Sequence, residues 1–360
     1  MSNGLIPATI LTGFLGSGKT TLLKRVLSEA HGQKIAVIEN EFGEENIDND
    51  ILVADTREQI IQMSNGCVCC TIREDLRSTL TDLAQRRRKG ELDFERVVIE
   101  TTGLADPGPV AQTFFMDDEV AESYLLDSVL TLVDAKHAGQ QLDQRQEARR
   151  QVGFADQIFI SKSDLVDDAA VDKLAHRLKH MNPRAPQQRV HFGEVPIRSV
   201  FDLKGFNLNA ALEVDPAFLE GDGHVGSQAG GHHGHDHGHA HDAHHDHAEG
   251  EHCDHPHHHH HDDDVKSLAF RSDRAFNAAK LEDFLGSVVQ VYGPKLLRYK
   301  GVLNMKGTDR KVIFQGVHQM MGSDLGPKWA PGEKKTSKMV FIGIDLPREI
   351  LVQGLEGCLE

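Results

Sequence analysis

The sequence contains little cysteine, no long apolar run and no excess of positive charge. Its five cysteines are too few and too unevenly spaced for a disulfide framework, and three of them fall within residues 67–70, which is typical of metal or redox chemistry in a reducing compartment. No apolar stretch approaches the ~18 residues of a membrane span, and the first residues show no secretory leader. We therefore expect a cytoplasmic protein that does not contact membranes.

The chain has fewer basic than acidic residues, and the excess of negative charge is concentrated in one segment. The chain has 39 Lys and Arg against 55 Asp and Glu, a formal net charge of -16, which argues against general nucleic-acid binding. Residues 220–264 contain eleven Asp or Glu, no Lys or Arg, and 17 of the 23 histidines. This segment lacks apolar periodicity and cannot bury enough surface to offset its ordering entropy, so we predict a disordered loop.

The loop divides the chain into an N-terminal domain (1–202), a linker with the His-rich loop (203–264) and a C-terminal domain (265–360). In the first, β-branched runs alternate with helical patterns, which predicts an α/β fold with a doubly wound, mostly parallel sheet. In the last, an apolar helix face over residues 281–292 predicts a smaller α+β domain with a mostly antiparallel sheet. The expected strands lie at residues 8–12, 35–39, 97–100, 129–133 and 157–161, then at 267–270, 296–304, 312–318 and 339–344, and the expected N-terminal helices at 20–30, 73–88 and 171–181.

One segment fits the pattern GxxxxGK[ST] in full, after an apolar strand and at the start of a helix, which is the context of a phosphate-binding loop. Its glycines let backbone N–H groups turn toward a β-phosphate, and the helix N-terminus adds partial positive charge. Lys19 can reach the β- and γ-phosphates, and the Thr20 hydroxyl can ligate Mg²⁺. The alternative is a glycine-rich turn that binds nothing. The segment consists of Gly13, Phe14, Leu15, Gly16, Ser17, Gly18, Lys19 and Thr20.

Two later segments fit a nucleotide hydrolase. Glu100 ends a buried strand, where a carboxylate can hold Mg²⁺ directly or through water, and Gly103 can approach a γ-phosphate closely. Ser161-Lys162-Ser163-Asp164 follows another strand, where a base-reading loop is expected. A buried Asp164 would pair with guanine N1–H and N2–H₂ but would lack a partner beside adenine, while the Lys162 stem could cover the base. The alternative is a polar loop in which Asp164 caps a helix.

Three thiols in four residues form a second centre. Cys67, Cys69 and Cys70 are badly placed for a mutual disulfide but can converge on one soft cation. Three sulfurs fall short of a closed zinc shell, which suits an ion that must be passed on. Glu39, Glu41 and Glu44 lie at and after the end of the second strand, and their loop could touch both the γ-phosphate and the metal as a switch. The alternative is a set of inert buried cysteines.

Five segments in this order, GFLGSGKT, ENEFGE, GCVCC, ETTGLADPGP and LLRYKG, resemble the CobW family of P-loop GTPases, most closely its YjiA-like branch. The resemblance covers almost the whole chain apart from the His-rich stretch. It implies a GTPase domain of the metal-chaperone class, a CobW C-terminal domain, slow GTP hydrolysis and delivery of zinc or cobalt to client proteins. It also implies that Cys67, Cys69 and Cys70 bind metal with help from Glu39 and Glu44. Ser161 stands where the family has Asn, which predicts weaker bracing of the base loop.

The His-rich loop is predicted to hold several weak, exchangeable sites for Zn²⁺, Co²⁺, Ni²⁺ or Cu²⁺, because neutral imidazoles and carboxylates bind them without a fixed geometry. A solvated spacer is the alternative. The histidines concerned are His232, His233, His235, His237, His239, His241, His257, His258, His259, His260 and His261. The isolated histidines His31, His137, His176, His180 and His191 are read as surface or satisfied core residues.

Together these patterns predict a cytoplasmic GTPase and metallochaperone with GTP, Mg²⁺ and Zn²⁺ as ligands, Co²⁺ or Ni²⁺ being possible cargo. Catalysis would rest on Lys19, Thr20 and Glu100, and turnover would be slow because no arginine finger is identifiable. The expected partners are a metalloprotein client and a second copy in a nucleotide-dependent dimer, with no nucleic acid. Two alternatives stay open: a metal-storage protein dominated by the His-rich loop, and an insertion factor for a cobalt or corrinoid enzyme.

Overall fold

The computed structural model describes residues 4–28, 33–40, 60–63, 71–203, 205 and 264–360. Its N-terminal part is a seven-stranded sheet of order β3-β2-β4-β1-β5-β6-β7 in which every pairing is parallel. The strands are β1 (Ile6–Gly13), β2 (Ile35–Asn40), β3 (Ile60–Met63), β4 (Arg96–Glu100), β5 (Tyr124–Asp134), β6 (Gln157–Ser161) and β7 (Gln187–Arg189).

Helices cover both faces of this sheet, as a parallel sheet with buried strands requires. They are α1 (Lys19–Ser28), α2 (Thr71–Arg88), α3 (Pro107–Met116), α4 (Asp118–Ala121), α5 (Ala138–Gln144), α6 (Gln146–Phe154) and α7 (Asp168–Met181), with 3₁₀ turns at Ser163–Leu165 and Ile197–Ser199. The predicted doubly wound α/β fold is confirmed. Ile10, Val97 and Val129 in the central strands are fully buried, which accounts for their unbroken apolar runs.

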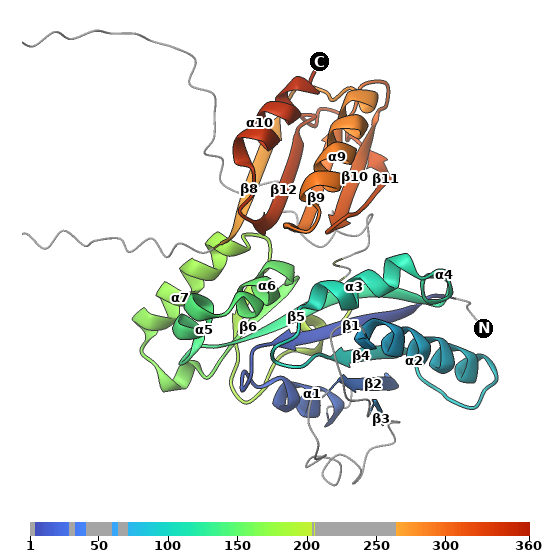
Figure 1. The fold of residues 1–360 in the computed structure, drawn as a ribbon, viewed down its shortest axis with the longest axis vertical. Coiled ribbons are helices and arrows are strands. Elements are labelled where there is room, and N and C mark those ends of the chain that lie inside the picture. The colour runs from blue at the N-terminus through green and yellow to red at the C-terminus, as the bar shows by residue number, and fades with distance from the viewer. Residues whose placement is uncertain (1–3, 29–32, 41–59, 64–70, 204, 206–263) are drawn as a thin grey trace, which may run out of the picture.

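The C-terminal part is a five-stranded antiparallel sheet of order β11-β10-β9-β12-β8, with two helices packed on one face (Figure 1). Its strands are β8 (Val265–Ser272), β9 (Leu296–Asn304), β10 (Arg310–Val317), β11 (Met320–Lys328) and β12 (Ser337–Ile344), and its helices are α9 (Ala278–Tyr292) and α10 (Arg348–Gly357). The predicted antiparallel α+β architecture is confirmed. The strand expected over residues 312–318 ends at Val317, because His318 turns the chain with φ 51°.

The two sheets share a continuous core. Val265, Leu297 and Ile342 of the C-terminal sheet belong to the same buried cluster as the strands of the parallel sheet. The contact is close at Gly153 on α6, where a Cβ atom would lie 2.7 Å from Leu297 Cδ1. Figure 1 shows α6 and α7 between the parallel sheet and strands β8 and β9. In the described part of the chain, no helix combines the length and apolarity needed to cross a bilayer.

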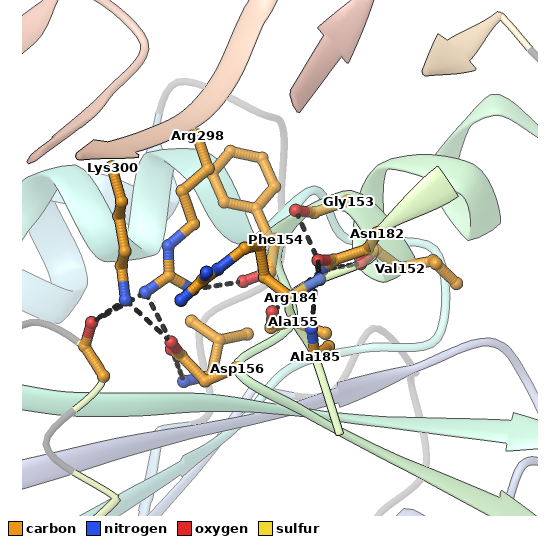
Figure 2. Close-up of polar contacts among 12 residues, drawn as sticks. Val152, Gly153, Phe154, Ala155, Asp156, Asn182, Arg184, Ala185, Arg298 and Lys300 are labelled. Atoms are coloured by element: carbon orange, nitrogen blue, oxygen red, sulfur yellow. Dashed lines mark hydrogen bonds and ion pairs between the residues drawn. The ribbon is translucent and has the colours of Figure 1, made fainter. Parts of the chain in front are cut away.

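A polar cluster joins the sheets, and we call it the joint: Asp156, Asn182, Arg298, Lys300 and Gly205. Arg298 donates to Phe154 O (2.9 Å), Asp156 Oδ1 (2.5 Å) and Gly205 O (2.9 Å). Lys300 Nζ lies 3.4 Å from Asp156 Oδ1 and also donates to Gly205 O. Figure 2 shows both cations of the LLRYKG segment pointing toward Asp156. This segment therefore fastens β9 to the loop before β6.

Candidate nucleotide and metal site

The phosphate loop folds as its glycines predict. Gly13, Gly16 and Gly18 adopt φ values of 146°, 72° and 98°, a region that side chains other than glycine rarely enter. At Gly13 a Cβ atom would lie 2.4 Å from Leu132 O and 2.7 Å from Ser17 Oγ. The loop runs from the end of β1 into the first residue of α1, so its backbone N–H groups gather at a helix N-terminus.

Lys19 is folded over this loop. Its buried Nζ donates to Gly13 O (2.9 Å) and approaches Phe14 O (3.5 Å). The same ammonium group is then available to phosphate oxygens that enter the loop, with a shift of the side-chain end. The structure therefore brings together the loop and the predicted cation.

Thr20 and Glu100 meet as predicted. Thr20 Oγ1 donates to Glu100 Oε1 over 3.1 Å, although the residues lie 80 positions apart. A hydroxyl and a carboxylate converging at the end of a buried strand are the hard oxygen donors that Mg²⁺ takes. Ser17 Oγ and Thr102 Oγ1, both buried, have no hydrogen-bond partner among the described residues. These orphaned hydroxyls and the Thr20–Glu100 pair fit a bound nucleotide with its metal ion.

Gly103 packs directly against the phosphate loop. A Cβ atom there would lie 2.5 Å from Leu15 N, so only glycine allows this approach. The segment is held from behind by α6, since Gln151 Nε2 donates to Gly103 O (3.1 Å) and Ala105 O (2.9 Å). Sequence reasoning missed Gln151, because nothing local marks a helical glutamine as a clamp.

The base loop, Ser161-Lys162-Ser163-Asp164, is held in place by Ser161, the residue that departs from the family pattern. Ser161 Oγ donates to Ser17 O of the phosphate loop over 2.7 Å. Whether serine braces the loop more weakly than asparagine stays a prediction, but the Ser161 hydroxyl does supply a direct bond between the two loops. Lys162 has φ 55° and donates to the buried Asp134 Oδ2 over 2.8 Å. Burial alone would raise the pKa of Asp134, but hydrogen bonds from Lys162 and His137 outweigh it and lower that pKa.

Asp164 lies at the mouth of the base loop rather than in its interior. Its side chain is 45% exposed, and Oδ1 lies 3.4 Å from His191 Nδ1. The expected buried carboxylate is thus corrected to an exposed one. The alternative in which Asp164 caps the next helix is also wrong, because Asp167 caps α7 by accepting from Ala170 N (2.7 Å).

His191 and Phe192 stand beside Asp164 and were not predicted as site residues. Phe192 is 74% exposed, with φ 45°, and its ring centroid lies 4.4 Å from that of His191. They follow β7, the neighbour of β6, so both loops open at the same edge of the sheet. An isolated His-Phe pair carries no sequence signal for this position.

The predicted transition-metal residues are only partly covered by the structure. Cys67, Cys69, Cys70, Glu44 and the eleven His-rich loop histidines lie outside the described residues, as does the segment predicted to be disordered (220–264) up to residue 263. Glu39 is described: it is in register with Glu100 on β4 and with Gln62 on β3. Strand β3 ends at Met63 and α2 begins at Thr71. In the sequence, the cysteine segment therefore follows the carboxyl end of β3, at the same sheet edge as Glu100. We call the edge that holds the phosphate loop, Glu39 and residues 100–103 the phosphate edge.

Comparisons with known proteins agree with this geometry. Residues 7–189 match the family described as CobW/HypB/UreG, nucleotide-binding domain, and residues 265–359 match the Cobalamin synthesis protein cobW C-terminal domain. The chain is 39% identical over 345 residues to the zinc chaperone YjiA of Escherichia coli (strain K12), covering 96% of each. It is 34% identical over 244 residues to zinc-regulated GTPase metalloprotein activator 1 of Dictyostelium discoideum, covering 58% of this chain and 50% of that protein.

The solved structure of Zn(II)-bound YjiA GTPase from E. coli has the same fold. It aligns with a TM-score of 0.72 and 34% sequence identity, covering 99% of this chain and 100% of that one. The two family matches and their order in the chain fit this relationship, and the resemblance seen in the five sequence segments is confirmed. The chain belongs to the CobW family.

Proposed function

We propose that this protein is a GTP-hydrolysing metallochaperone that carries zinc to client proteins in the cytoplasm. The observation that carries the nucleotide half is the convergence of Thr20 and Glu100, 3.1 Å apart, beside the N-terminus of α1. The relatives named as zinc chaperone and zinc-regulated GTPase support the cargo and the activity. The client and a nucleotide-dependent dimer belong to the same proposal.

Each residue of the nucleotide site would have a defined role in this function. Backbone N–H groups of the loop from Gly13 to Gly18 would bind the β-phosphate, and Lys19 would bridge the β- and γ-phosphates. Thr20 and Glu100 would hold Mg²⁺, which when bound neutralises charge that develops on the phosphate oxygens. Gly103 would present its backbone to the γ-phosphate, and turnover is slow unless a partner supplies further positive charge.

The base would be chosen by Asp164. Its exposed carboxylate can accept from guanine N1–H and N2–H₂, and a bound base would bury it. Discrimination then arises when the base shields the carboxylate from water, since adenine would leave it without a donor. His191 and Phe192 would line the same mouth.

Zinc would bind through Cys67, Cys69 and Cys70, with Glu39 and Glu44 as acidic candidates. Support comes from the register that sets Glu39 beside Glu100 at the phosphate edge. A change at the γ-phosphate would then reach the metal shell over one strand spacing of about 4.8 Å. Coupling of this kind is reciprocal, so zinc and GTP must alter each other's affinity by one factor.

The test measures GTP hydrolysis and GTP affinity in Thr20→Ala, with Thr21→Ala as the matched control on the exposed side of α1. Thr20→Ala should lower hydrolysis roughly 100-fold or more, whereas Thr21→Ala should retain it. Equal activity in the two variants would refute the Mg²⁺ assignment.

A competition titration of GTP against ATP, in the wild type and in Asp164→Asn, tests base choice. Asp168→Asn is the control, because that carboxylate pairs with Arg189 on the surface. Wild type should favour GTP by roughly tenfold or more, equivalent to about 1–3 kcal/mol, and only Asp164→Asn should lose the preference. Equal wild-type affinities would remove the basis for a GTPase.

A further inference from the structure

Two histidines on α7 form a cluster that the nucleotide site does not use. His176 and His180 are separated by one helical turn, and both are exposed. Their Nε2 atoms lie 3.0 Å apart, with ring centroids at 4.5 Å and planes at 83°. We call them the His176–His180 pair. Their exposure agrees with the prediction of surface or satisfied core histidines, but the sequence did not indicate that the two rings face each other.

The helix presents this pair on a fixed frame. α7 is capped at Asp167 and packs its opposite face into the core through Val171, Leu174, Leu178 and Met181. Side chains four residues apart lie one above the other on a helix, so both imidazoles stand on the same exposed stripe. Because the backbone is held, bringing the second ring to a ligand costs little further ordering.

The spacing suits two ligands on one metal ion. With metal–nitrogen distances of about 2.0–2.1 Å, nitrogens 3.0 Å apart subtend roughly 91–97° at the ion. That angle matches neighbouring positions of a square-planar or octahedral shell, and opening by a few tenths of an ångström reaches the tetrahedral angle of zinc. Both Nε2 atoms already converge, so no change of helix geometry is needed.

The surroundings leave the site open and set its charge. Asp172, one turn before His176, is engaged by Arg189 at 2.7 Å, and Arg177 pairs with Asp143 at 2.8 Å. Lys173 and Lys179 are the exposed cations of the same helix. Two protein nitrogens with water in the other positions make a weak and rapidly exchanging site.

The pair also lies where the chain returns from residues 206–263. The carbonyl of His180 accepts from Ser267 Oγ on β8 over 3.2 Å. Asp264, the first described residue after that range, is only three residues earlier, a span of about 10 Å in extended chain. The described chain thus resumes close to this imidazole pair, directly after residues 206–263, whose sequence contains 17 histidines.

We propose that His176 and His180 form an open, exchangeable site for a divalent transition-metal ion such as Zn²⁺ or Ni²⁺, separate from the cysteine segment. Its place on α7, close to where the described chain resumes at Asp264, makes it a fixed docking point for ions on the protein surface. It lies on α7 and uses no residue of the phosphate edge.

The experiment is histidine footprinting with diethylpyrocarbonate on the full chain, read for the α7 peptide by mass spectrometry. Free Zn²⁺ is fixed with a nitrilotriacetate buffer, so that other sites cannot deplete it. In the wild type, acylation of His176 and His180 should slow in parallel over one range of free Zn²⁺. In His176→Gln, half-protection of His180 should move to at least about tenfold higher Zn²⁺, because a chelating partner is lost.

Lys179→Gln is the matched control, since it changes an exposed neighbour on the same turn without removing an imidazole. It should leave the protection of both histidines in place, and all variants should keep wild-type GTP hydrolysis and circular dichroism. Protection of His180 at the same Zn²⁺ in wild type and His176→Gln would overturn the proposal. So would full reactivity of both residues at Zn²⁺ levels that protect the peptides of residues 206–263.

Discussion

The joint and the phosphate edge are both buried polar regions, but they differ in how their polar side chains are paired. At the joint, Asp156 accepts from Val129 N and is faced by Arg298 and Lys300. Asn182, also there, donates to Val152 O and Ala155 O at 2.9 Å (Figure 2). At the phosphate edge, buried hydroxyls lack partners within the described residues. The charged groups of the joint pair with each other and with carbonyl oxygens, and so hold the two sheets together, whereas the open hydroxyls of the phosphate edge can receive a ligand.

The comparison predicts that Asp156→Asn acts on stability alone. It leaves Arg298 and Lys300 buried without their counter-charge, which should cost about 3–5 kcal/mol of unfolding free energy. Denaturant unfolding measures this loss. Asp345→Asn is the control, because its pair with Lys295 spans 3.8 Å on the surface and should contribute little. A loss equal to that of the control would mean that the ion pairs of the joint do not stabilise the fold.

The opposite case is Lys19→Ala, which should act on function alone. Removing the cation from the phosphate loop should lower GTP hydrolysis roughly 100- to 1,000-fold, equivalent to about 2.7–4 kcal/mol. The unfolding midpoint without nucleotide should stay near the wild-type value, since the hydrogen bonds of Lys19 to Gly13 O and Phe14 O lie within its own loop. Strong destabilisation would show that the phosphate edge is also structural.

The joint should also make stability depend on alkaline pH. Burial, with repulsion from Arg298, lowers the pKa of Lys300 from 10.5 to about 7. Between these values the unfolded chain holds more protons than the folded one, so stability rises with pH. The unfolding free energy of the wild type, measured relative to that of Lys300→Met, should rise by about 1–2 kcal/mol from pH 7.5 to pH 9. A constant difference would contradict the lowered pKa.

The smallest effect is expected for Ser161→Ala, which removes the bond between the base loop and the phosphate loop. Losing one hydrogen bond to Ser17 O should cost about 1 kcal/mol, seen as roughly fivefold weaker GTP binding in a titration. Ser163→Ala, two residues on, should leave affinity unchanged. If Ser161→Ala binds GTP as tightly as wild type, the brace does not support the nucleotide site.

Sequence patterns predicted those structural features that residues close together in the chain determine. The turn from β1 into α1 follows from the glycines and Lys19, and β9 matches its expected run from Leu296 to Asn304. Strand β11 was not expected, because Gly322, Gly326 and Pro327 interrupt its pattern. It forms at the edge of its sheet, where only β10 pairs with it and a residue without an N–H is tolerated.

Contacts between distant residues could not be predicted in this way. Ser161 reaches Ser17 over 144 positions, and Arg298 reaches Asp156 over 142. No periodicity or spacing encodes which serine or arginine will meet which partner, because the first contact depends on the strand order of the parallel sheet and the second on how the two sheets pack. His318 was overlooked for this reason: it is buried at a turn, and its ring lies 5.3 Å from that of Phe154.

Helix α6 has a mechanical consequence. Gln151 holds Gly103 at the phosphate edge, and three residues later the carbonyl of Phe154 holds Arg298 at the joint. The two hydrogen-bonding residues are about 4.5 Å apart along one helix. The core around the helix is closely packed and leaves little room for a displacement to be absorbed. A displacement of Gly103 would therefore act on Arg298 through a single helix, which makes α6 the direct mechanical connection between the phosphate edge and strand β9.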